Sequence, residues 1–192
     1  MTERIASAGA ESGGLFERVS EGVYRTRSSQ GTSLLGELLG RAAQAGDAVV
    51  LAGDLGAGKT CLTGGVARGL GDGSNVSSPT FNIMCVHDGG RIPLYHFDLY
   101  RLDDASQLED TGVFDALEGD GLCVVEWGDL FAEELGDDLL TVEITRGDAG
   151  DAAPGGTEAE PARTLTLRES GERSAALLRR FETEAAKERA TR

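Results

Sequence analysis

A glycine-rich segment running from Gly53 to Thr60, GDLGAGKT, has the residue types and spacing of a phosphate-binding loop. It fits the pattern G-x-x-x-x-G-K-[ST], in which backbone N–H groups at the start of a helix converge on phosphate oxygens. Lys59 is expected to reach the β- and γ-phosphates of a nucleotide, and the Thr60 hydroxyl to bind Mg²⁺. The predicted nucleotide contacts in this segment are Gly53, Asp54, Leu55, Gly56, Ala57, Gly58, Lys59, Thr60 and Cys61.

Lysine usage supports this interpretation. The chain has only two lysines among 18 basic residues, and one of them, Lys59, occupies the loop. Arginine is bulkier and cannot replace a compact ammonium at that site. This explains why a chain that otherwise uses arginine has a lysine there.

Two carboxylates end predicted strands where a magnesium nucleotide would need them. Glu126 follows the apolar run Leu-Cys-Val-Val, and Asp98 ends another predicted strand, YHFD. Ligands of open α/β sheets bind at the carboxyl ends of the strands. Glu126 is expected to bind the metal directly, to bind it through a water molecule, or to serve as base for the attacking water. In a joint role, one of the two acids would hold magnesium and the other would orient the water. For Asp98 a salt bridge with Arg101 is the competing interpretation.

Three further residues are candidates for switching or partner contacts. Ser78 and Thr80 lie in Ser-Ser-Pro-Thr-Phe, where P-loop proteins often sense the γ-phosphate, although a simple turn before a strand explains the segment equally well. Trp127, the single tryptophan, would contact nucleotide or partner, or pack in the core.

The elements that must position these residues follow from hydrophobic periodicity. A helix is expected from Thr32 or Ser33 to Ala42, and another from Lys59 to Leu70. Two continuous apolar runs, ending at Gly53 and Glu126, predict strands buried on both faces. The pattern indicates a three-layer α/β domain with a mixed, partly parallel sheet, extended at one edge by a C-terminal antiparallel hairpin.

Composition sets the organisation and excludes some functions. We expect a disordered tail over 1–16, a single domain over 17–190 and a flexible low-complexity loop over 147–160. A net charge of −15 argues against direct tRNA binding by the protein alone. The chain has neither a signal-peptide pattern nor an 18-residue apolar run, which predicts a cytoplasmic protein with no membrane association.

The motifs GDLGAGKT, SPTF, YHFDLYRL and VVEW, in that order, resemble the TsaE (YjeE) family of P-loop ATPases in tRNA threonylcarbamoyladenosine biosynthesis. The resemblance implies a P-loop fold and weak ATPase activity that depends on the TsaD- and TsaB-type subunits of the threonylcarbamoyl-transferring synthase. ATP and Mg²⁺ are the implied cofactors. It also implies magnesium positions at Thr60 and Glu126, a catalytic acid at Asp98, a switch-like segment with Ser78 and Thr80, and a nucleotide contact near Thr32.

Two other functions use the same loop. A small-molecule kinase would need an acceptor site, and no acceptor-binding motif is evident in the sequence. A nucleotide-dependent switch with incidental hydrolysis needs the same loop and acids, so the sequence leaves it open.

Overall fold

The computed structural model describes residues 14–79, 82–147 and 160–191. The strands are β1 (Phe16–Ser20), β2 (Val23–Thr26), β3 (Ala48–Ala52), β4 (Met84–His87), β5 (Leu94–Asp98), β6 (Leu122–Glu126), β7 (Leu140–Arg146) and β8 (Arg163–Glu169). The helices are α1 (Ser29–Ala42), α2 (Lys59–Leu70), α3 (Val113–Leu117), α4 (Ala132–Leu135) and α5 (Glu172–Thr191), with short 3₁₀ helices η1 (Ala105–Thr111) and η2 (Gly128–Phe131).

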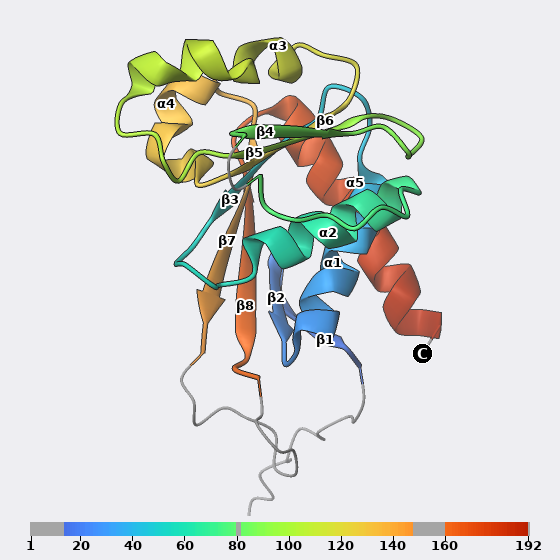
Figure 1. Ribbon diagram of the computed structural model, residues 1–192. Coiled ribbons are helices and arrows are strands. Elements are labelled where there is room, and N and C mark those ends of the chain that lie inside the picture. The colour runs from blue at the N-terminus through green and yellow to red at the C-terminus, as the bar shows by residue number, and fades with distance from the viewer. Residues whose placement is uncertain (1–13, 80–81, 148–159, 192) are drawn as a thin grey trace, which may run out of the picture.

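All of these strands belong to one mixed sheet, in the order β1-β2-β8-β7-β3-β6-β5-β4. The central strands β7, β3, β6 and β5 run parallel, and antiparallel strands complete the sheet on both sides. Helices α1, α2 and α5 cover one face, whereas α3 and α4 cover the other (Figure 1). The predicted α/β class with a partly parallel sheet is confirmed.

Burial of the central strands follows from this layering. Every residue of β3 and β6 is buried. Along β3, Val49 and Leu51 join the core under α1 and α2, while Ala48 and Val50 join the core on the opposite face. Because helices cover both faces, these strands have to be apolar on both sides. Glu126, the last residue of β6, is the one charged residue in these two strands, and it too is buried, with only 2% of its surface exposed.

Helix α2, which follows the predicted phosphate-binding loop, is held by close backbone contact with α1. Gly36 of α1 faces the Leu62 carbonyl, and Gly65 of α2 faces the Ser33 carbonyl, so closely that a Cβ at either glycine would overlap the oxygen. Gly40 and Gly69 make the same kind of contact one turn further along. These glycines let the two helices approach closely, which sets the position of the N-terminus of α2.

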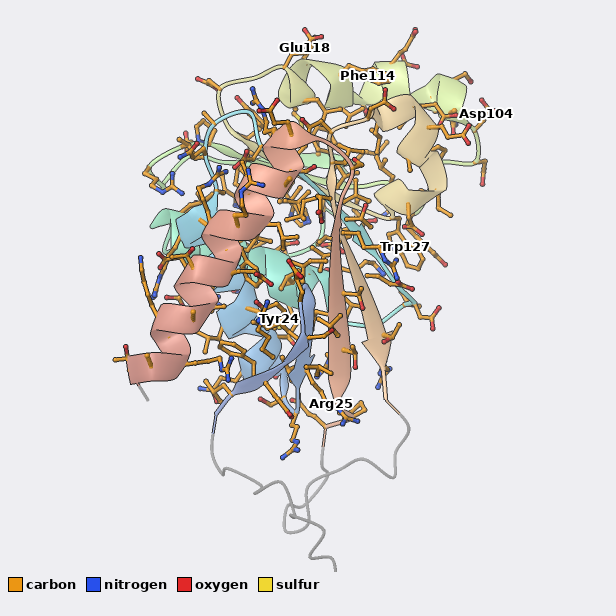
Figure 2. All side chains as sticks on the ribbon, turned by 180° about the vertical axis from the view of Figure 1, so that it is seen from behind. Tyr24, Arg25, Asp104, Phe114, Glu118 and Trp127 are labelled. Atoms are coloured by element: carbon orange, nitrogen blue, oxygen red, sulfur yellow. The ribbon has the colours of Figure 1, made fainter. Side chains whose placement is uncertain are left out.

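The C-terminal hairpin of β7 and β8 lies inside the sheet instead of at its edge. β7 pairs directly with β3, and β8 pairs on its other side with β2, so β1 forms that edge. Tyr24 of β2 packs edge-to-face on Phe181 of α5, at 5.2 Å between ring centroids, and Figure 2 shows it beside that helix. The N-terminal hairpin of β1 and β2 therefore forms this sheet edge, where the sequence predicts the C-terminal hairpin.

The described chain begins inside the region that the sequence assigns to a tail. Phe16 is the first residue of β1, and its side chain is only 8% exposed. Residues 1–13 and 148–159, which make up most of the predicted tail and of the predicted flexible loop, lie outside the described residues. Both ends of that loop make contacts: the Gly147 N–H donates to the Ala162 carbonyl, and Glu160 accepts from Ser29.

Candidate nucleotide-binding site

The predicted phosphate-binding loop connects the end of β3 to the start of α2. Gly53, Gly56 and Gly58 have left-handed φ angles of 131°, 75° and 118°, which residues with a Cβ rarely adopt. Gly53 also lies against the Ile144 carbonyl, where a Cβ would overlap the oxygen. The loop thus forms a cradle of main-chain atoms at the N-terminus of α2, the end of a helix that attracts anions.

Lys59, the first residue of α2, is buried against this loop, with only 5% of its surface exposed. Its Nζ donates to the carbonyl oxygens of Gly53, at 2.5 Å, and Asp54, at 3.0 Å. The same nitrogen lies 3.6 Å from the centroid of the Trp127 ring. Burial lowers the pKa of Lys59 from its ordinary value, and the charges of nearby carboxylates, Glu126 first, oppose that shift.

Thr60 and Glu126 meet directly, although they are 66 residues apart. The Thr60 hydroxyl donates to Glu126 Oε2 at 3.0 Å, and the other carboxylate oxygen, Oε1, lies 2.8 Å from His96 Nε2. Pairing of β3 with β6 aligns Leu51 with Glu126, which brings the end of β6 to the loop. Sequence reasoning had paired Thr60 and Glu126 as magnesium positions but had given His96 no role.

Asp98 lies beside Glu126 on the neighbouring strand, since the two residues are register partners in the β5–β6 ladder. One oxygen of Asp98 accepts a hydrogen bond from the Ser78 hydroxyl, and the other accepts from the Tyr100 N–H at 3.2 Å. The structure therefore joins the predicted switch residue to the predicted catalytic acid. Thr80, the other predicted residue of that segment, lies outside the described residues.

Trp127 covers this cluster from the end of β6. Within the described chain it is the one non-glycine residue with a left-handed φ, 62°, and its ring lies 5.0 Å from that of Tyr100. Figure 2 shows Trp127 apart from Asp104, Phe114 and Glu118, which mark η1 and α3. The turn at Trp127 places its ring over Lys59 and leaves it partly exposed.

The start of α1 and the start of β8 border the loop on another side. Arg163 Nε donates to the Ala57 carbonyl at 3.0 Å, and the Cys61 thiol donates to the Ser29 carbonyl at 3.3 Å. Burial raises the pKa of that thiol. Arg163 entered no predicted site, and only the pairing of β8 into the sheet brings it to the loop.

Thr32 lies inside α1, because this helix begins earlier than predicted. Its N-cap is Ser28, whose hydroxyl accepts from the Gly31 N–H, so neither Thr32 nor Ser33 caps it. Thr32 is fully buried, and its hydroxyl bonds to the Thr26 hydroxyl, at 2.9 Å, and to the Ser28 carbonyl, at 3.3 Å. Its methyl group is the part that faces the loop, near Gly58.

Comparison with known proteins gives the same family as the motifs. The family model described as "Threonylcarbamoyl adenosine biosynthesis protein TsaE" matches residues 26–152, more than half of the chain. The chain belongs to the TsaE family. The tRNA threonylcarbamoyladenosine biosynthesis protein TsaE of Bacillus subtilis is 44% identical over 128 residues, 67% of this chain and 78% of that protein. The Streptomyces coelicolor TsaE is 44% identical over 142 residues, 72% of this chain and 90% of that protein.

A solved structure agrees with the TsaE fold seen here. The crystal structure of YdiB from Bacillus subtilis superposes with a TM-score of 0.66 at 31% sequence identity, covering 85% of this chain and 95% of YdiB. At that identity and coverage, the two chains share the same fold.

The residues of this TsaE site fit a magnesium nucleotide. A hydroxyl and a buried carboxylate supply oxygen ligands, which Mg²⁺ prefers, and magnesium is usually held by one or two carboxylates together with substrate phosphates. The described residues contain no group of three or more His, Cys, Asp or Glu side chains able to hold a metal unaided.

In the same part of the chain, no helix is long and apolar enough to cross a membrane.

Proposed function

We propose that this TsaE protein binds and hydrolyses ATP with Mg²⁺ in the pathway that forms the threonylcarbamoyl group on adenosine 37 of tRNAs. The proposal rests on the hydrogen bond between Thr60 and Glu126 at the glycine-rich loop, where Lys59 is buried. The names of its relatives support the pathway, since they are tRNA threonylcarbamoyladenosine biosynthesis proteins.

The loop, Thr60, Glu126 and Asp98 have different parts in this activity. Loop N–H groups and Lys59 bind the phosphates, and Thr60 and Glu126 hold the metal. Asp98, oriented by the Ser78 hydroxyl and the Tyr100 N–H, accepts a hydrogen bond from the attacking water. The bound magnesium nucleotide supplies the transferable phosphoryl group and its charge compensation.

The proposed partners are the TsaD- and TsaB-type subunits of the synthase. The protein acts on these subunits and does not bind tRNA directly. With a net charge of −15, it lacks the positive balance that nucleic-acid binders use to neutralise phosphates. An acidic protein of this kind fits a role as an accessory to a complex that already holds the RNA.

ATP hydrolysis by the purified protein, alone and with those subunits, tests the proposal. We expect the subunits to stimulate hydrolysis and Lys59→Ala to abolish it. Lys187→Ala is the matched control, because Lys187 is the second lysine and lies on the exposed surface of α5, bonded to Glu184. Equal, partner-independent rates in wild type and Lys59→Ala would overturn the proposal.

A further inference from the structure

One fully buried polar side chain beside Glu126 has no role in the proposed activity. His96 is 0% exposed, and its Nε2 lies 2.8 Å from Glu126 Oε1. Its second ring nitrogen, Nδ1, has no hydrogen-bond partner among the described residues. An ionised carboxylate only accepts hydrogen bonds, so Nε2 is the donor when Glu126 is ionised.

Strand geometry explains why these two side chains meet. His96 is the register partner of Val124, and Asp98 is the register partner of Glu126. Side chains two residues apart on a strand point to the same face, so His96 and Glu126 are diagonal neighbours under α2. The parallel ladder holds this arrangement in place.

The two oxygens of the Glu126 carboxylate have different hydrogen-bond partners. Oε1 accepts from His96, while Oε2 accepts from Thr60, the other proposed magnesium ligand. A carboxylate without the His96 contact would be free to rotate about its last torsion, which is broad and two-fold. With His96 in place, Oε2 stays aimed at Thr60.

We propose that His96 is a positioning residue that orients Glu126 toward magnesium. The inference rests on the proposed magnesium nucleotide function of this site. Groups that hydrogen-bond to metal ligands orient those ligands, and their loss typically costs about 10- to 100-fold in metal affinity. In this role His96 acts through Glu126 and not on the nucleotide or the reacting water itself.

Calorimetric titration of a non-hydrolysable ATP analogue at increasing Mg²⁺ concentrations tests this role apart from turnover. We expect His96→Phe to bind the analogue without magnesium within about twofold of wild type, and to need about 10-fold or more Mg²⁺ for half of the magnesium-dependent gain in affinity. His96→Gln, which keeps an N–H donor, is expected to recover most of that gain.

His87→Phe is the matched control. The His87 ring stacks near His96, at 6.1 Å between centroids, and its Nε2 has no hydrogen-bond partner among the described residues. An equal rise in the magnesium requirement of His87→Phe and His96→Phe would assign the effect to packing and overturn the inference. Unchanged magnesium dependence in folded His96→Phe would also overturn it, while the proposed function would stand.

Two further outcomes are decisive. Magnesium-independent binding by wild type would overturn the proposed function and this inference together. If His96→Phe fails to fold, His96→Gln is compared with His96→Asn, because the shorter amide does not reach Glu126. Equal magnesium dependence in these two variants would then overturn the positioning role.

Discussion

Lys59 Nζ lies 3.6 Å from the centroid of the Trp127 ring while it donates hydrogen bonds to two carbonyl oxygens of its own loop. A cation over an indole face is stabilised by the ring quadrupole. The ammonium has three N–H donors, and the carbonyl oxygens of Gly53 and Asp54 occupy two of them, so a phosphate would take the third donor or replace a carbonyl. We therefore expect nucleotide binding at Lys59 to alter the surroundings of Trp127.

The first prediction is a fluorescence change. Because Trp127 is the only tryptophan, emission excited at the indole reports this one position. We expect saturable quenching or a spectral shift when ATP is added to the wild type or to Lys187→Met, and none with Lys59→Met. A full response in Lys59→Met would show that Trp127 does not sense the loop lysine.

The second prediction concerns Glu126→Gln. The amide keeps the size of the carboxylate but loses its charge, so we expect nucleotide binding to persist while hydrolysis and tRNA modification are lost. Nucleotide binding, ATP turnover and threonylcarbamoyladenosine content in a strain carrying the variant are the three measurements. Modification that persists without turnover would favour a nucleotide-dependent switch over a cycling ATPase.

The third prediction is a cost at Gly53. Alanine there would combine a φ of 131° with an overlap on the Ile144 carbonyl, so Gly53→Ala is expected to lower the free energy of unfolding by about 1–3 kcal/mol. Gly73 has nothing within 4 Å of an added Cβ, and Gly73→Ala should stay within about 0.5 kcal/mol of wild type. Urea unfolding measures both, and equal effects would contradict the steric account.

The fourth prediction separates two adjacent glycines of α2. Gly65→Ala would push against the Ser33 carbonyl of α1 and should cost about 1–3 kcal/mol, with weaker nucleotide binding because the helix start moves. At Gly64 the nearest atom to an added Cβ is 3.8 Å away, so Gly64→Ala should gain up to about 1 kcal/mol from helix propensity. Thermal unfolding of the pair tests this opposite sign.

The fifth prediction is acid sensitivity at Glu160. The Ser29 N–H and the Ser29 hydroxyl hold the pKa of Glu160 below its ordinary value of 4.5. A carboxyl whose pKa is lower in the folded state stabilises above its unfolded pKa, and this contribution is lost as the pH falls through the folded pKa. The melting temperature of Glu160→Gln should therefore be below wild type near pH 6 and converge with it below pH 4.5. A constant gap across that range would contradict the linkage.

Local patterns predicted the parts of the molecule that depend on neighbouring residues. The helix from Lys59 to Leu70 begins and ends as expected, because the loop glycines and the apolar spacing lie within the same segment. The two buried strands before Gly53 and at Glu126 were also recognisable, since burial on both faces demands continuous apolar runs. Helix α1 begins at Ser29, earlier than the apolar periodicity predicts, because Ser28 caps it.

By itself, the sequence determined the loop, the two acids near it and the family, since motif spacing and strand ends are local properties that the chain carries wherever it folds. Only the tertiary structure decided which strand lies at the sheet edge. It also decided that His96 contacts Glu126 Oε1 and that Arg163 donates a hydrogen bond to the Ala57 carbonyl. Those relationships depend on strand order and register, which arise from pairing between distant segments. The alternating pattern predicts that β7 and β8 pair with each other, but no local signal says which distant strands lie beside them.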